Sequence, residues 1–133
     1  MPIEDFADFL LEHTGGQLTE VGIGFQFKVA LRLMEGGREV TAIDWNRDAV
    51  EKARELGINA HIDDIFHPRL GLYEGSRALY SVRPTPEIIK PILGLGRVLG
   101  TPVFILPLAG DAMPRFMRLV NFRGLAIYTT KPI

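Results

Sequence analysis

Residues 18–27, LTEVGIGFQF, contain two glycines in Gly-x-Gly spacing, Gly22 and Gly24, with an acid, Glu20, ahead of them. Glycines between a strand and a helix let a ligand approach the backbone, and the following helix presents free amide groups to it. A tight turn without any ligand also uses such glycines. The stretch therefore predicts either a nucleotide-binding loop or a plain strand-to-helix turn, in an α/β fold.

The residues around this loop have the pattern of a strand followed by a helix. Residues 18–23 are predicted to form a buried strand. The spacing after them predicts a helix over about 25–35, ended by the glycines at 36 and 37. The residues expected to face the core are Phe27, Ala30, Leu31 and Met34, with Lys28, Arg32 and Glu35 facing water.

Strands and helices alternate along the rest of the chain. Helices are expected in the first 13 residues, over 46–56 and from Thr85 toward Leu99, with Pro91 kinking the last helix or delaying its start. Strands are expected at 39–44, 58–62, 77–82 and 101–106, and 63–75 is expected to be irregular. Residues 116–122 and 125–129 predict a hairpin turning at Arg123-Gly124. This order predicts about seven strands in a doubly wound, mostly parallel α/β sheet with a C-terminal antiparallel hairpin.

A second Gly-x-Gly sequence, Gly94-Leu95-Gly96, occurs late in a predicted helix and follows no strand. We interpret it as close packing or helix fraying rather than as a ligand loop.

Composition limits the classes of function. The 133 residues are 47% hydrophobic and 23% charged, which predicts one domain over residues 1–133. A net charge of −1 without a run of Lys or Arg argues against nucleic acid as a partner. There is no cysteine, and His13, His61 and His67 lack the spacing of a zinc site, so no metal is expected. No apolar run approaches a membrane span, and acids occupy the N-terminus where a signal peptide is basic, so a cytoplasmic location is expected.

Asp44 follows Gly22 by 22 positions and ends the predicted second strand. An acid at this place commonly hydrogen-bonds ribose hydroxyls. Because the strand end faces the predicted cleft, loss of Asp44 is expected to weaken ligand binding and to leave folding little affected. A dinucleotide is disfavoured, because Phe27 stands where its pattern has a third glycine and the charge of Glu20 would oppose a pyrophosphate. A ligand with a cationic end is favoured.

The run "EVGIGF…AID" resembles motif I and the following acid of class I S-adenosylmethionine-dependent methyltransferases. The resemblance implies a three-layer Rossmann-like fold with S-adenosylmethionine as cofactor. It implies that Glu20 interacts with the methionyl amino group, often through water in that family, and that Gly22 and Gly24 allow backbone approach. It also implies that Asp44 binds the ribose and that Trp45 lies against the adenine. The run "IDDIF" at 62–66 resembles the later motif whose acid contacts the adenine amino group; Asp64 matches that acid best, with Asp63 second.

A narrower group matches more of the chain. "VGIGF-FKVA", "AIDWN", "DDIFHP" and "YSVRPTPE" together resemble the uncharacterised archaeal protein family 0146, over roughly residues 20–108. This resemblance implies no established activity.

Candidates for binding a second substrate, Ser81 and Arg83, lie at the end of the fourth predicted strand. An arginine there is suited to clamp a carboxylate or phosphate, and a structural salt bridge is the alternative. His61 and His67 are interpreted as structural, and the loop acid Asp111 is a weaker substrate candidate. No catalytic base stands out. Three hypotheses remain. The first is a minimal methyltransferase for a small or macromolecular substrate, acting alone, as a homo-oligomer or completed by a partner subunit. The others are a non-catalytic module for an adenosyl ligand and an NAD-binding module.

Overall fold

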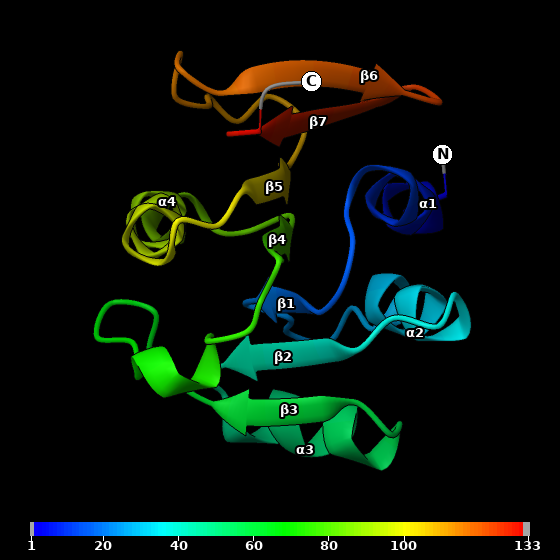
Figure 1. The fold of residues 1–133 in the computed structure, drawn as a ribbon, viewed down its shortest axis with the longest axis vertical. Coiled ribbons are helices and arrows are strands. Elements are labelled where there is room, and N and C mark those ends of the chain that lie inside the picture. Colours follow the sequence, from blue (N-terminus) through cyan, green and yellow to red (C-terminus); the bar gives the residue numbers. More distant parts are fainter. Residues whose placement is uncertain (1, 132–133) are drawn as a thin grey trace.

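The computed structural model describes residues 2–131, which form a seven-stranded sheet with helices on both faces (Figure 1). The helices are α1 (Glu4–His13), α2 (Lys28–Glu35), α3 (Arg47–Glu55) and α4 (Pro86–Leu99), with one 3-10 turn at Leu70–Leu72. The strands are β1 (Leu18–Val21), β2 (Val40–Asp44), β3 (Asn59–Ile62), β4 (Ala78–Val82), β5 (Val103–Leu106), β6 (Arg118–Phe122) and β7 (Leu125–Thr129).

The sheet order is β3-β2-β1-β4-β5-β7-β6. The first five strands pair in parallel, with Leu18 beside Val40 on one side and Ala78 on the other, and β7 runs antiparallel to both β5 and β6. The predicted fold, a mostly parallel α/β sheet with a C-terminal antiparallel hairpin, is therefore confirmed. The strand order reverses beside β1, which is where ligands bind in sheets of this kind.

The two faces of the sheet are covered differently. Residues of α1, α2 and α3 share one core with the inward side chains of β1, β2 and β4. On the opposite face α4 packs together with Tyr73 and Met117, which lie outside the helices and strands. Figure 1 shows α4 and the green 63–77 segment on the side of the sheet away from α1 and α2. This second face has loops between β3 and β4 and between β5 and β6, apart from one 3-10 turn.

Helix α2 presents a different face from the one predicted. Its buried residues are Val29, Ala30 and Leu33, whereas Phe27 and Leu31 are only partly buried. The helix begins at Lys28, later than expected. Val29 and Leu33 are four residues apart, so they lie one turn apart on the face of the helix that packs against the sheet. The prediction of inward residues was right for Ala30 and incomplete for the others.

Helix α4 starts at Pro86 and contains Pro91, so the expectation of a delayed start was wrong, and the alternative expectation, a kink at Pro91, stays a prediction. Proline removes the hydrogen bond to the carbonyl four residues earlier, which here belongs to Glu87 in the exposed first turn. Because Glu87 is exposed, water is expected to replace this hydrogen bond. The helix starts on Pro86, a favourable first position, and ends at Gly100 in the left-handed conformation.

Glycine geometry explains two other local features. A Cβ on Gly96 would come within 2.5 Å of Val103 Cγ2, so this glycine allows α4 to approach β5 closely, as predicted. The hairpin turns at Arg123 (φ 51°) and Gly124 (φ 84°), the paired left-handed conformation of a two-residue hairpin loop. Within residues 2–131, no helix has the length and apolar character needed to cross a membrane.

Candidate active site

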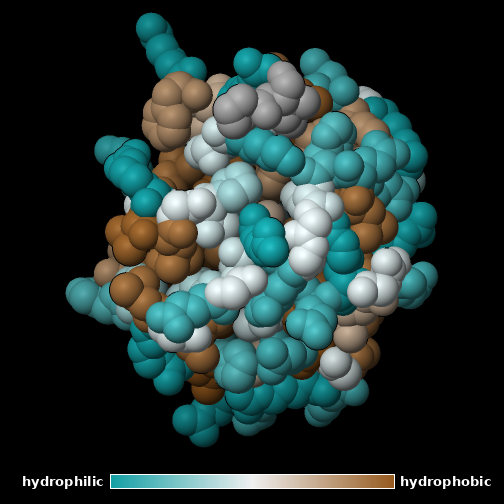
Figure 2. Space-filling view, viewed as in Figure 1, coloured by the Kyte–Doolittle hydropathy of each residue, from teal (hydrophilic) through white to brown (hydrophobic). Residues whose placement is uncertain are grey.

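One cavity of about 560 Å³ lies at the carboxyl ends of β1, β2 and β4. Its volume is in the range of small-molecule sites. The residues that line it come from four places in the chain: Val21 and Gly22; Ile43, Asp44 and Trp45; residues 63–66; and Arg83, Pro84, Thr85, Glu87 and Ile88. In Figure 2, hydrophobic residues gather at the left of the view, where α4 and the 63–77 segment lie in Figure 1.

The glycine loop has the backbone geometry that its sequence requires. Gly22 (φ +72°) and Gly24 (φ +53°) both adopt the left-handed region, which disfavours residues with a Cβ. A Cβ on Gly22 would also stand 3.1 Å from Ile88 Cδ1. The N–H groups of Gly22 and Ile23 both donate to the Ile43 carbonyl, at 2.8 and 3.1 Å, so the loop is fixed to the end of β2.

Asp44 connects the glycine loop to the start of α3. Its Oδ2 accepts a hydrogen bond from the Gly24 N–H at 2.7 Å, and its Oδ1 accepts one from the Asn46 N–H at 2.9 Å. Asn46 in turn caps α3 by accepting from the Asp48 N–H at 2.8 Å. Each carboxylate oxygen has a second lone pair left for a ligand hydroxyl. The expectation that loss of Asp44 leaves folding little affected is revised, because two backbone donors depend on this carboxylate.

Trp45 follows Asp44 and presents its side chain to solvent at the edge of the cavity. The residue is 78% exposed and lines the cavity, although tryptophan is normally mostly buried. Phe66 also lines the cavity and is 53% exposed. Two exposed aromatic rings beside one cavity are suited to a planar ligand.

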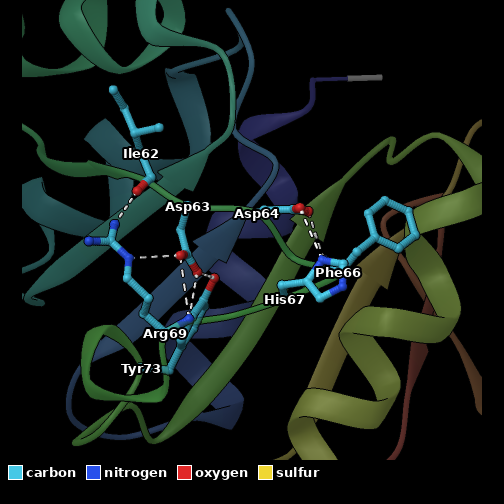
Figure 3. A network of polar contacts seen from close by, with 7 residues as sticks. All are labelled: Ile62, Asp63, Asp64, Phe66, His67, Arg69 and Tyr73. Atoms are coloured by element: carbon cyan, nitrogen blue, oxygen red, sulfur yellow. Dashed lines mark hydrogen bonds and ion pairs between the residues drawn. The ribbon is translucent and has the colours of Figure 1, made fainter.

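The neighbouring acids Asp63 and Asp64 have different environments, and Figure 3 shows their carboxylates pointing in different directions. Asp63 is buried. It accepts a hydrogen bond from the Tyr73 hydroxyl at 2.8 Å and forms an ion pair with Arg69, whose Nε lies 3.0 Å from its Oδ1. Arg69 also donates to the Ile62 carbonyl. Burial, followed by the hydrogen bond to Asp63, raises the pKa of Tyr73 well above its usual range.

Asp64 is more accessible than Asp63. Its Oδ1 accepts from the Phe66 N–H at 2.9 Å, and its Oδ2 lies 3.4 Å from the exposed His67 ring (Figure 3). Both acids line the cavity, but the Asp63 carboxylate already accepts hydrogen bonds from Arg69 and Tyr73. Asp63 thus holds the 63–73 segment in place, and Asp64 is the acid better placed to accept from a ligand.

Glu20 is completely buried and is not among the cavity-lining residues. Burial raises its pKa to about 8, partly offset by the nearby Tyr80 hydroxyl and reinforced by the charge of Asp44. The Tyr80 hydroxyl approaches the carboxyl group without reaching good hydrogen-bond geometry, so the Glu20 oxygens lack a hydrogen-bond partner in the described structure. The expected interaction of Glu20 with the methionyl amino group stays a prediction, and this geometry favours an indirect effect through the glycine loop over a direct contact.

Ser81 and Arg83, the predicted substrate residues, lie in different environments. Ser81 is fully buried, and its hydroxyl donates to the Val21 carbonyl at 2.7 Å, which links β4 to β1 beneath the cavity. It does not line the cavity, so its substrate role stays a prediction that the geometry does not favour. Arg83 is exposed and does line the cavity.

The remaining candidates lie outside the cavity lining. His61 is half-buried on the edge strand β3, and His67 is exposed on the 63–73 segment. Asp111 lies in the loop before β6, with one buried carboxylate oxygen lacking a hydrogen bond. No group of three or more His, Asp or Glu side chains suited to a metal ion occurs among residues 2–131.

Sequence reasoning missed the cavity residues Phe66, Thr85, Glu87 and Ile88. Thr85 and Pro86 were recognised as a helix start, and the position of that start after β4 was the available signal that the first turn of α4 faces the cavity. Nothing in the local sequence distinguishes Phe66 from a core aromatic residue.

Comparison with known proteins supports the fold. A chain from Pyrococcus abyssi, UPF0146 protein PYRAB01940, is 46% identical over 129 residues, covering 96% of this chain and 98% of the relative. An RNA methyltransferase from Salinibacter ruber, solved with S-adenosyl-L-homocysteine, superposes with a TM-score of 0.68 at 21% identity, covering 97% of this chain and 90% of that one. A TehB-like SAM-dependent methyltransferase from Corynebacterium glutamicum gives a TM-score of 0.66 at 16% identity, covering 96% and 87%.

The structural neighbours therefore have the Rossmann-like fold of class I methyltransferases, and at these identities they establish the fold alone. The family model described as "Uncharacterised protein family (UPF0146)" matches residues 3–132. Together with the Pyrococcus relative, this match confirms the resemblance found in the sequence motifs. The chain belongs to the uncharacterised protein family UPF0146.

Proposed function

We propose that this cavity binds S-adenosylmethionine or S-adenosylhomocysteine and that the chain is a minimal methyltransferase with an acceptor still to be identified. The observation that carries the proposal is the convergence of Gly22, Asp44, Trp45 and Asp64 on one cavity. These residues come from three separate segments. The Gly24 N–H bond to Asp44 further joins the glycine loop to the acid.

The groups around the cavity fit an adenosyl ligand. The free lone pairs of Asp44 are suited to accept from two ribose hydroxyls, and the exposed Trp45 ring offers a face for the adenine. Asp64 is suited to accept from the adenine amino group. The absence of a side chain at Gly22, where a Cβ would approach Ile88, leaves space for a ligand over the loop.

An adenosyl ligand suits the site better than a dinucleotide. Phe27 stands at the position of the third glycine, which a dinucleotide site uses for close packing of the helix on the strand, and its side chain packs against the core instead. Among the described residues, the cavity is lined by four acids and one basic residue, Arg83. The acids are Asp44, Asp63, Asp64 and Glu87. A pyrophosphate would meet this excess of acids, whereas the cationic sulfonium and amino group of S-adenosylmethionine would be attracted by it.

Glu20 has an indirect part in this proposal. With a pKa of about 8, its carboxyl group is mostly neutral at pH 7. A cationic ligand end near the glycine loop would favour the ionised form. At about pH 7, ligand binding is therefore expected to release a proton from the Glu20 carboxyl group.

The lack of an obvious catalytic base is compatible with methyl transfer. When bound, S-adenosylmethionine supplies an already activated methyl group, so the protein contributes mainly binding, orientation and exclusion of water. The Gly22, Asp44 and Trp45 side of the cavity would fix the nucleoside, and the β4 side, with Arg83, is open to an acceptor.

Calorimetric titration tests the proposal. S-adenosylmethionine, S-adenosylhomocysteine and NAD are titrated into the wild type and into Glu51→Ala, a control that removes an exposed acid of α3 outside the cavity. We expect both adenosyl compounds to bind at least about tenfold more tightly than NAD, equally in the two proteins. Tighter binding of NAD would overturn the ligand assignment, and binding without transfer to any acceptor would leave a non-catalytic module.

A further inference from the structure

Arg83 is the basic side chain of the cavity within residues 2–131, and it lies directly after β4. In the sheet order, β4 is beside β1 on the side opposite β2. The proposed nucleoside contacts, Asp44 and Trp45, lie at the end of β2 and directly after it. Arg83 is therefore across the glycine loop from the nucleoside side, where a second molecule would approach.

The backbone at Arg83 is held in an unusual conformation. Its φ of 49° places it in the left-handed region, and the next residue is Pro84, before which extended backbone is the norm. The Arg83 N–H donates to the Leu106 carbonyl at the end of β5, at 2.6 Å, and so fixes this conformation. Among the described residues other than glycine, Arg123 also has a positive φ, and there the two-residue hairpin turn requires it. Backbone strain of this kind concentrates at functional sites.

The Arg83 guanidinium has no hydrogen bond or ion pair within residues 2–131, although four acids line the same cavity. Asp44 is engaged by backbone amides, Asp63 by Arg69 and Tyr73, and Asp64 by the Phe66 amide. Glu87 lies in the first turn of α4 and forms no ion pair with Arg83. The fork of five N–H donors thus remains available to a ligand.

We infer that Arg83 binds the oxyanion group, carboxylate or phosphate, of a small methyl acceptor. This inference rests on the proposed function and names its substrate class. Guanidinium binds either group through two parallel hydrogen bonds, and one such pair fixes both the position and the orientation of the acceptor. A polyanion such as nucleic acid is disfavoured, because the net charge is −1 and the other charged groups of the cavity are acids.

The test compares Arg83→Met with Arg115→Met, which removes an exposed arginine outside the cavity lining. Calorimetry first measures S-adenosylhomocysteine binding to the wild type and both variants, which tests the proposed function by itself. Inorganic phosphate and succinate are then titrated separately into each protein, with and without S-adenosylhomocysteine, and binding is followed by NMR of the backbone amides around the cavity. The two anions show whether the site selects phosphate or carboxylate.

We expect Arg83→Met to lower the affinity for at least one anion by about tenfold or more, while the S-adenosylhomocysteine affinity stays within about twofold and Arg115→Met behaves as wild type. Equal anion binding by wild type and Arg83→Met would overturn the inference. A tenfold loss of S-adenosylhomocysteine affinity in Arg83→Met would also overturn it, because Arg83 would then hold the carboxylate of the cofactor. If S-adenosylhomocysteine does not bind the wild type at all, the proposed function fails, and Arg83-dependent anion binding without it still supports an anion site.

Discussion

The chain contains two Gly-x-Gly sequences, and the structure uses them in opposite ways. Gly22 and Gly24 have positive φ at the turn after β1, and Asp44 accepts from the Gly24 N–H. Gly94 and Gly96 lie within α4, where Gly96 gives Val103 the space to pack. The same spacing thus serves backbone conformation beside a cavity in one case and helix–strand packing in the other. The surrounding strand, helix and acid decide which, and the variants below test that difference.

The largest expected effect concerns Glu20, the buried acid that precedes the first glycine pair. The pKa of Glu20 is about 4.5 when exposed and about 8 in the folded chain, so between these values the native state holds a proton that the unfolded state has lost. Stability should therefore fall as pH rises through this window, by roughly 1 kcal/mol per pH unit. Glu20→Gln removes the titration and should flatten this fall, as measured by urea unfolding at several pH values. Identical slopes for both proteins between about pH 5 and pH 8 would contradict the assignment.

Gly22→Ala tests the conformational requirement at the first pair. Positive φ costs a residue with a Cβ about 1–2 kcal/mol, and the new methyl group would meet Ile88 Cδ1. We expect that loss in the free energy of unfolding, together with a fall of at least about tenfold in S-adenosylhomocysteine affinity. Unchanged affinity in the folded variant would mean that the loop is only a turn.

Gly96→Ala tests the packing requirement at the second pair. The added Cβ would stand 2.5 Å from Val103 Cγ2 and 3.0 Å from the Thr101 carbonyl oxygen. Overpacking costs about 1–3 kcal/mol, and alanine regains up to about 1 kcal/mol in helix propensity. A net loss of about 1–2 kcal/mol is expected in urea unfolding. Ligand affinity should stay at the wild-type value, and a selective loss of binding would contradict the packing role.

Gly94→Ala is the matched control in the same helix and has the smallest expected effect. A Cβ added at Gly94 would meet no neighbouring atom of residues 2–131 within 4 Å, so the substitution should gain helix propensity without strain. A rise of about 0.5–1 kcal/mol in the free energy of unfolding is expected. A loss as large as that of Gly96→Ala would show that both glycines are needed for packing.

Most of the fold was predictable because its signals are local. Alternating strands and helices, the Asn46 cap and the Arg123-Gly124 turn all follow from residues close together in sequence. The inward face of α2 was less predictable, because both Val29 and Leu31 fit an apolar stripe and the sheet decides between them.

The site was predictable only in part. Gly22, Asp44, Trp45, Asp64 and Arg83 do line one cavity, as strand ends in a parallel sheet should. That Glu20 and Ser81 do not line the cavity was not predictable, because a central parallel strand is covered on both faces and its sequence pattern does not say which side chains reach the cavity. The Asp63–Tyr73 hydrogen bond depends on the path of an irregular segment, for which periodicity gives no information.

The central claim is that the first glycine pair and Asp44 form an adenosyl-ligand site. The single tryptophan, Trp45, lines the cavity, so its fluorescence reports on this site alone. Titration of S-adenosylhomocysteine should change the Trp45 emission saturably in the wild type. In Asp44→Ala the affinity should be at least about tenfold weaker, since charge-assisted hydrogen bonds are worth about 1.5–3 kcal/mol each.

Asp44→Ala also removes the acceptor of the Gly24 and Asn46 amides. The free energy of unfolding of this variant should therefore fall by about 1–3 kcal/mol. The titration is run under conditions in which circular dichroism shows the variant to be folded. Glu51→Ala, with an exposed acid of α3 removed, should titrate as wild type. The account predicts a saturable Trp45 response that shifts at least about tenfold in Asp44→Ala alone. Equal responses in wild type and folded Asp44→Ala, or none in either, would contradict it.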